Sequence, residues 1–366
     1  MTVDVCPSKI RIEVKARGES ACRPSLESPD FWDLMLSISS FKRAIESAGG
    51  AARSAKLEAV KRGFSIYGNS VEVVAMDDLI HGQYPDAFKD AGALIHIAAP
   101  LIGREATPKA ALDVSVLGSL NIIKQAEKAG IKTIGYVSSI FAASTALLQG
   151  DFTPVNENQW LPITREDVLN NKDVDGATVY IAEKALSERA VWDFVDQHPH
   201  LEVTTVNPPF FYGPFAPGYR APYLGDPFSS NNLSTLAILW NLIHPKGPIA
   251  SPYFVDVRDV ARALVASLNS PSTAQVGRKR ILMTSEWVQP SEIAALVKQH
   301  RPELASRVCE AMQEPITGLT NITDNKRLKE VLGLEPTPWR KTILDGVDTL
   351  VAVENAWKAR GVAISL

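Results

Sequence analysis

The side chains with the clearest chemical potential are a tyrosine and a lysine four positions apart, Tyr180 and Lys184, in a stretch with helical patterning (177–197). On a helix this spacing places both side chains on one face. A free Tyr hydroxyl has a pKa of about 10, and an ammonium group one turn away favours the phenolate and lowers that pKa. Such a tyrosine can pass a proton to or from a carbonyl oxygen. The pair therefore predicts acid-base chemistry on a carbonyl compound.

A pair of hydroxyls, Ser138 and Ser139, closes a predicted strand upstream of this helix. The carboxyl ends of parallel strands meet at one edge of a sheet, which is where open α/β folds bind ligands. A hydroxyl at that edge can hydrogen-bond a substrate carbonyl and stabilise charge on its oxygen. Lys184 has a second possible task, because its three donors can hold the ribose hydroxyls of a nucleotide.

The elements that must position these residues form an α/β pattern. Short apolar runs alternate with helical stretches from about residue 49, which predicts a parallel sheet covered by helices on both faces. The predicted strands are 71–76, 93–98, 133–138 and 201–206, and the predicted helices are 85–90, 109–129 and 177–197. After residue 206 the chain is rich in Pro, Gly and aromatic residues. Helices are predicted at 233–243 and 290–300, with a last one ending near residue 359.

Composition narrows the class of protein. The chain has 366 residues, 45% of them hydrophobic and 22% charged, and a formal net charge of -3, so no basic field for nucleic acid is present. Its three cysteines, Cys6, Cys22 and Cys309, form no C-x-x-C pair and indicate neither a disulfide framework nor a zinc ribbon. No apolar stretch is long enough to span a bilayer, and residues 1–15 carry no apolar signal core. We expect a cytoplasmic protein that acts on small molecules and binds neither nucleic acid nor membrane.

The order of the motifs gives a family resemblance. The matching segments are 78–79, 95–100, 118–121, 136–139, 180–184, 207–214 and 254–260. Together they resemble the extended short-chain dehydrogenases/reductases, the NAD-dependent epimerase/dehydratase family, in the branch of dihydroflavonol reductase, cinnamoyl-CoA reductase and yeast methylglyoxal reductase. The resemblance spans roughly residues 50 to 350. It implies a Rossmann-type doubly wound parallel sheet with a smaller, mixed C-terminal substrate-binding region.

The resemblance also implies how the chain divides. Residues 1–48 are an atypical segment, 49–212 form the NAD(P)-binding core with a contribution from 250–285, and 213–249 with 286–366 form the substrate-binding region. The oligomeric state is not indicated.

The resemblance implies a role for each matching residue. Ser139 would orient the substrate carbonyl, Tyr180 would donate the proton, and Lys184 would anchor the ribose and lower the pKa of Tyr180. The implied cofactor-binding residues are Arg53, Lys56, Asp78, Leu79, Ala98, Pro100, Tyr180, Lys184, Pro208 and Phe211. A guanidinium at Arg53 suits a 2'-phosphate, which favours NADPH over NADH.

Three residues carry smaller expectations. Asp113 stands where many relatives have Asn, and Glu183 precedes Lys184 where Ser or Thr is usual. Adjacent helix positions point apart, so Glu183 is expected to affect Lys184 little. His96, on a buried strand, is interpreted as a core histidine with a satisfied hydrogen bond.

The family's phosphate-binding loop is missing. Relatives open with G-x-x-G-x-x-G between a strand and a helix, where glycines let the backbone approach the pyrophosphate. Before Gly63 this chain has only Gly18, Gly49 and Gly50. Residues 34–48 resemble a shortened strand, turn and helix without glycine in the turn. Three explanations stay open: an incorrect or alternatively spliced translation, a variant that binds nucleotide less tightly, and a protein without catalysis.

The sequence thus favours an NADPH-dependent carbonyl reductase that converts a ketone or aldehyde to an alcohol. Its aromatic segment 210–212 indicates a hydrophobic substrate, such as an aromatic or polyketide intermediate of secondary metabolism. Two alternatives remain: epimerisation or dehydration of a nucleotide sugar on the same scaffold, and a non-catalytic dinucleotide-sensing protein.

Overall fold

A computed structural model gives the structure of the chain. It describes residues 58, 61–62, 65, 73–76, 78–97, 105–216, 233, 235–244, 251–309 and 315–361. The predictions for residues 34–48, Arg53, Lys56, Ala98 and Pro100 fall outside these residues.

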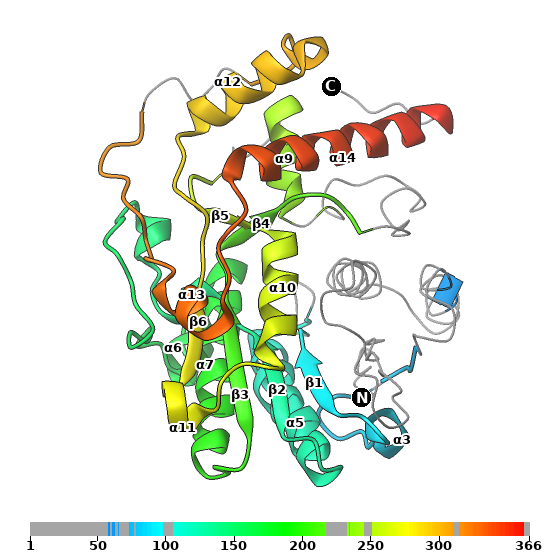
Figure 1. Cartoon of the computed structure of the whole chain (residues 1–366), viewed down its shortest axis with the longest axis vertical. Coiled ribbons are helices and arrows are strands. Elements are labelled where there is room, and N and C mark those ends of the chain that lie inside the picture. The colour runs from blue at the N-terminus through cyan, green and yellow to red at the C-terminus, as the bar shows by residue number, and fades with distance from the viewer. Residues whose placement is uncertain are drawn as a thin grey trace.

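The central sheet of the described part is parallel, in the order β1-β2-β3-β6 (Figure 1). Its strands are β1 (Ala93–His96), β2 (Thr133–Val137), β3 (Glu202–Asn207) and β6 (Lys279–Leu282). The register pairs Ile134 with Val203 and Val206 with Ile281. Strands buried on both faces need no strict alternation of apolar and polar residues, and β1 and β2 accordingly read as largely apolar runs. The predicted parallel sheet is confirmed.

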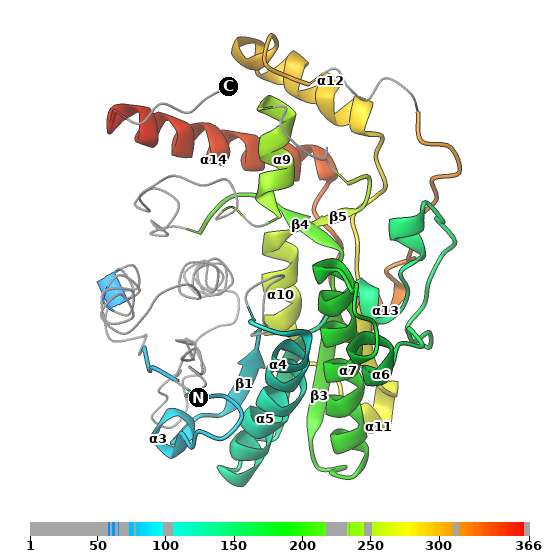
Figure 2. The same cartoon turned by 180° about the vertical axis from the view of Figure 1, so that it is seen from behind.

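Helices cover both faces of this sheet (Figures 1 and 2). On one face lie α4 (Pro108–Asp113), α5 (Ser119–Lys128), α6 (Arg165–Leu169) and α7 (Gly176–Asp196); on the other lie α10 (Val257–Ser267) and α13 (Lys326–Leu332). The first face packs Ile123 and Trp192 against Leu94 and Ile134 of the strands. The second packs Leu264 and Leu328 against β3 and β6. Two buried layers define the doubly wound arrangement that the sequence predicts.

The predicted helix 109–129 is present but not uniform. Between α4 and α5, the segment Val114–Gly118 is π-helical, a form that proteins use in short pieces and frequently at functional sites. Gly130 ends the stretch with φ +89°, as expected for a glycine after a helix C-terminus.

One predicted strand differs. Of the segment 71–76, residues 73–76 are described, and they form no ladder with any described strand. Met76 is nevertheless buried in the layer that contains Leu94 and Ile123. The apolar pattern therefore predicted burial correctly, whereas a strand also requires a hydrogen-bonded neighbour.

A second body of structure sits above the carboxyl ends of the central strands (Figure 1). It contains the parallel pair β4 (Phe210–Tyr212) and β5 (Phe254–Asp256) and the helices α9 (Leu236–Ile243), α12 (Pro290–His300) and α14 (Trp339–Ala359). Their apolar faces share one core with Trp240, Ile293 and Val347. Five short elements complete the described part: α3 (Pro85–Phe88), α11 (Thr273–Val276), and the 3-10 helices η3 (Ile140–Ala142), η4 (Ala146–Gln149) and η6 (Pro302–Leu304). No helix in the described ranges is both long and apolar enough to cross a membrane.

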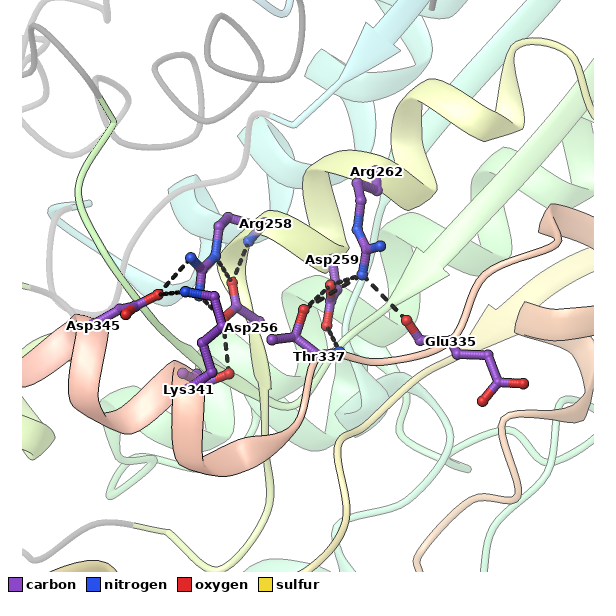
Figure 3. A network of polar contacts seen from close by, with 9 residues as sticks. Asp256, Arg258, Asp259, Arg262, Glu335, Thr337, Lys341 and Asp345 are labelled. Carbon is purple, nitrogen blue, oxygen red and sulfur yellow. Dashed lines mark hydrogen bonds and ion pairs between the residues drawn. The ribbon is translucent and has the colours of Figure 1, made fainter. Parts of the chain in front are cut away.

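A network of charged residues fastens α14 to the start of α10 (Figure 3). Asp256, the N-cap of α10, is fully buried and accepts hydrogen bonds from Arg258 and from Thr342 Oγ1 (2.7 Å). Arg258 also pairs with Asp345 (2.6 Å), which Lys341 contacts as well. Partial burial acts to raise the pKa of Asp345, but the hydrogen bonds from Lys341 and Arg258 outweigh it and lower the pKa.

One turn further along α10, Asp259 accepts hydrogen bonds from the backbone N–H (2.6 Å) and hydroxyl (2.8 Å) of Thr337, and it pairs with Arg262 (Figure 3). Burial raises the pKa of this carboxyl despite the Thr337 and Arg262 contacts. The two carboxylates at the start of α10 thus hold both the residues before α14 and its first turns.

Gly346 of α14 lies directly against Gly213, just after β4. A Cβ at position 346 would lie 2.8 Å from Leu239 Cδ2 and 3.3 Å from the backbone nitrogen of Gly213. Gly213 itself has φ +125°, which only glycine adopts without strain. The close contact between α14 and the end of β4 therefore depends on two glycines.

We predict that Gly346→Val lowers the free energy of unfolding by about 1–3 kcal/mol, because the added methyl groups overpack this contact. The matched control is Gly92→Val, since a Cβ there would meet nothing within 4 Å; it should change stability by less than about 0.5 kcal/mol. Urea denaturation measures both. Equal stability of the two variants would contradict the assigned contact.

Candidate active site

Helix α7 carries the predicted proton donor and its lysine. Asp175 caps its N-terminus by accepting from Thr178 N, and the helix starts at the carboxyl edge of the sheet (Figure 2). Tyr180 is half-buried and Lys184 is buried, with Lys184 Nζ 5.8 Å from the centroid of the Tyr180 ring. The two side chains lie on one face of the helix, as the spacing predicts.

Ser139 follows β2 and caps the short 3-10 helix η3 (Ile140–Ala142). Its Oγ accepts from Phe141 N (3.3 Å) and donates to the Pro208 carbonyl at 3.5 Å. The backbone N–H of Ile140 donates to that same carbonyl at 3.0 Å. The hydroxyl contact is at the limit of hydrogen-bond length, so a better acceptor can replace it at little cost.

The segments with Ser139, Tyr180 and Pro208 meet in one apolar cluster. Tyr180 and Phe210 both pack against the cluster that contains Ile140 and Phe141, and the rings of Phe141 and Phe210 meet edge to face with their centroids 6.0 Å apart. The fold thus places the serine, the tyrosine and the 208–211 segment around one region at the carboxyl edge.

The aromatic segment 210–212 divides between core and site. Tyr212 is fully buried, accepts from Ser251 N (3.1 Å), and has a pKa raised by burial. Phe210 is half-buried and packs against the same cluster as Tyr180, whereas Phe211 packs against a different cluster, as do Ile95 and Ile97. Alternate residues of β4 therefore face opposite sides, and Phe210 is the ring on the tyrosine side.

Asp78 and Leu79, predicted to border the adenine, form a turn held by α5. Asp78 Oδ1 accepts from the backbone N–H groups of Ile80 (2.9 Å) and His81 (3.0 Å). The buried Leu79 accepts at its carbonyl from Asn121 Nδ2 (2.9 Å). A Cβ on Gly118 would lie 3.1 Å from Leu79 Cβ, so the glycine sets how closely the turn approaches the helix. The matching segments 78–79 and 118–121 are thus one structural unit.

The described residues suit a dinucleotide lying along the carboxyl edge. Lys184 supplies a buried ammonium donor and Tyr180 a hydroxyl, both suited to ribose oxygens. Leu79 supplies an apolar border and Pro208 a second buried one. These donors and apolar borders match the chemistry of a nicotinamide dinucleotide.

Two of the sequence-level departures have structural partners. Asp113 pairs with Lys109 (2.6 Å) and Arg165 (2.5 Å). Partial burial acts to raise its pKa, but the Lys109 and Arg165 hydrogen bonds outweigh it and lower the pKa. Glu183 is buried and accepts from Ser115 Oγ at 3.0 Å, in the π-helical segment. An acid therefore suits both positions, because Arg165 donates to Asp113 and Ser115 donates to Glu183 from a different element.

His96 is a core histidine, as interpreted from the sequence. It is buried, and its Nε2 lies 3.0 Å from Ser119 Oγ.

Sequence reasoning missed a buried carboxylate beneath this site. Glu188 lies one turn after Lys184, is fully buried, and pairs with Arg280 of β6 (2.8 Å). The available signal was its position, four residues after Lys184 and one turn before the apolar Val191 and Trp192. Asn207, at the end of β3, joins the same network through Nδ2, while its buried Oδ1 has no hydrogen-bond partner among the residues that the structure describes.

Comparison with known proteins identifies the family. The family model described as "NAD dependent epimerase/dehydratase family" matches residues 51–281. The chain belongs to this family, which confirms the resemblance seen in the sequence.

The chain is similar to the putative NADPH-dependent methylglyoxal reductase of Candida albicans, with 25% identity over 76% of this chain and 82% of that protein. It is also similar to the ketoreductase azaE of Aspergillus niger, with 27% identity over 76% of this chain and 82% of that protein. Among solved structures, the yeast methylglyoxal/isovaleraldehyde reductase Gre2 complexed with NADPH superposes with a TM-score of 0.66, at 21% identity over 82% of this chain and 90% of that one. This likeness confirms the Rossmann-type fold.

We predict that Asn121→Leu weakens NADPH binding, because the Asp78-Leu79 turn loses the amide that holds the Leu79 carbonyl. Loss of a hydrogen bond worth about 1 kcal/mol should raise the dissociation constant roughly fivefold. Fluorescence titration with NADPH measures it. The control is Lys128→Ala, exposed on the same helix, which should leave the constant unchanged. An equal effect in both variants would remove this turn from the cofactor site.

Proposed function

We propose that this protein is an NADPH-dependent carbonyl reductase that converts a ketone or aldehyde to an alcohol. The observation that carries the proposal is the meeting of the Tyr180-Lys184 face of α7 with Ser139 at the carboxyl edge of the sheet. Reductase names among the relatives, two of them NADPH-dependent, support both the reaction and the cofactor.

Each residue has a defined task in this reaction. NADPH, when bound, supplies the hydride that adds to the carbonyl carbon. Tyr180 holds the proton that passes to the carbonyl oxygen, and Lys184 stabilises the phenolate that remains. Ser139 turns its hydroxyl from the Pro208 carbonyl to the substrate oxygen and stabilises the charge that develops there. Hydride on carbon and proton on oxygen together give the alcohol.

The substrate class follows from the surroundings of Tyr180. Phe141, Phe152, Leu161 and Phe210 pack in the cluster around it, so the substrate proposed is a hydrophobic carbonyl compound, such as an aromatic or polyketide intermediate. A panel of such ketones and aldehydes, compared with small polar ones, tests this class.

The remaining parts of the proposal are a cytoplasmic location and a reaction distinct from sugar epimerisation. The cysteine pattern supports a reducing compartment. The relatives named above are reductases rather than epimerases, and release of the nucleotide during purification would agree with them.

We predict that Tyr180→Phe lowers kcat by about 10²- to 10⁴-fold, because the ring stays while the transferable proton is lost. NADPH consumption with an accepted substrate measures it, and the melting temperature should stay close to that of the wild type. Tyr212→Phe is the control: it removes a hydroxyl buried in the core and should leave kcat unchanged. Undiminished turnover by Tyr180→Phe would refute the assigned role.

A further inference from the structure

The buried acid Glu188 uses every acceptor position of its carboxylate. Oε1 accepts from Thr205 Oγ1 (3.0 Å) and Arg280 Nε (2.8 Å). Oε2 accepts from Ser138 Oγ (2.6 Å) and Asn207 Nδ2 (2.7 Å). A carboxylate offers about four lone-pair sites, so no acceptor capacity remains for a ligand. The role of Glu188 must therefore be to fix the positions of the residues that donate to it.

Two of these four donor residues are in direct contact with Ser139, one through the chain and the other through a hydrogen bond. Ser138 is its chain neighbour, and Asn207 Nδ2 also donates to the backbone carbonyl of Ser139 at 3.1 Å. Glu188 thus fixes the peptide on both sides of the Ser139 Cα, one through a side-chain hydroxyl and the other through an amide.

The same residue also fixes the helix that bears the proton donor. Tyr180, Lys184 and Glu188 follow one another at intervals of four residues, so they share one face of α7. A contact at Glu188 therefore sets how far α7 is rotated and shifted against β2 and β3. The Glu188 carboxylate thus connects the segment that bears Ser139 with the helix that bears Tyr180. In the proposed reaction both hydroxyls must reach the same carbonyl oxygen.

Arg280 makes this arrangement possible by supplying the compensating charge. Its Nη1 donates to the carbonyls of Glu157 (2.9 Å) and Gln159, and its guanidinium lies 3.8 Å from the centre of the Trp160 ring. All five donors need partners in a buried site, and these contacts hold the arginine rigidly. Arg280, which pairs with Glu188, is thus held in place by other residues.

We infer that Glu188 is a positioning residue for Ser139: through Ser138 and Asn207 it holds the serine in line with the proton donor on its own helix. The inference rests on the proposed function, because it assigns Ser139 to the substrate carbonyl. It assigns no contact between Glu188 and substrate or cofactor.

The first test is amide hydrogen exchange in the free protein, which requires no activity. Glu188→Gln should lower the protection of the amides of 138–142 by about tenfold, because Ser138 N and Ile140 N then hold their bonds to Val206 and Pro208 less firmly. The matched control is Glu202→Gln, which removes the charge of the Glu202–Lys279 pair (2.7 Å) between the starts of β3 and β6, at the end of β3 opposite to Asn207. Equal loss of protection at 138–142 in both variants would overturn the inference.

The second test is a double-mutant cycle with Ser139→Ala. Glu188→Gln should lower kcat by about 10- to 100-fold in the wild type, since small misplacements of catalytic groups have effects of this size, and by a clearly smaller factor in the Ser139→Ala background, where only the position of Tyr180 is still disturbed. A merely structural role would give the same factor in both backgrounds and would overturn the inference. If Ser139→Ala alone left kcat unchanged, the role proposed for Ser139 itself would fail.

A milder pair of variants decides the case if Glu188→Gln does not fold. Ser138→Ala and Thr205→Val each remove one hydroxyl donor to Glu188 and leave the ion pair with Arg280 in place. Only Ser138 adjoins Ser139, so Ser138→Ala should lower kcat about tenfold and Thr205→Val should change it less than twofold. Equal effects of the two variants would overturn the inference.

Discussion

The ion pair between Glu188 and Arg280 is the interaction on which the arrangement of this site depends. It joins α7 to β6 and, through Thr205, Ser138 and Asn207, to the ends of β2 and β3. Removing one partner of such a pair leaves an uncompensated buried charge, whereas replacing both by apolar residues is often neutral or stabilising. Its value therefore lies in specifying one position of the helix against the sheet, which matters where a serine and a tyrosine act on the same atom.

The C-terminal elements are held to this frame at two points. Asp256 and Asp259 fasten the start of α14 to α10 (Figure 3), and the Gly213-Gly346 contact brings α14 against the end of β4. Strand β4 also carries Phe210, which packs against the same apolar cluster as Tyr180. The position of the apolar wall around the tyrosine thus follows from the packing of α14, far away in the sequence. The wall of the proposed substrate site and the attachment of the C-terminal region are therefore parts of one structure.

Much of this was predictable because it is local. Apolar runs and helical periodicity gave β1, β2, β3 and α7 within a few residues, and the i, i+4 spacing placed Tyr180 and Lys184 together. Two features were not predictable: residues 73–76, within the predicted strand 71–76, pair with no described strand, and the segment Val114–Gly118 is π-helical. Each depends on neighbours from other parts of the chain. Glu188 was missed for the same reason: a lone acid on a helix signals a solvated position unless its arginine, 92 residues away, is known. All the catalytic and cofactor-binding assignments stay predictions, and those at Arg53, Lys56, Ala98 and Pro100 also lie outside the described residues.

The central claim is that this chain, although it lacks the glycine-rich loop, binds NADPH and presents it to Tyr180. Isothermal titration of the full chain with NADPH tests this most directly. The account predicts one cofactor bound per chain with a dissociation constant below about 1 mM, the upper end of the usual range for enzymes and their substrates, and weaker binding after Lys184→Met. Absence of any saturable binding up to that concentration would contradict it.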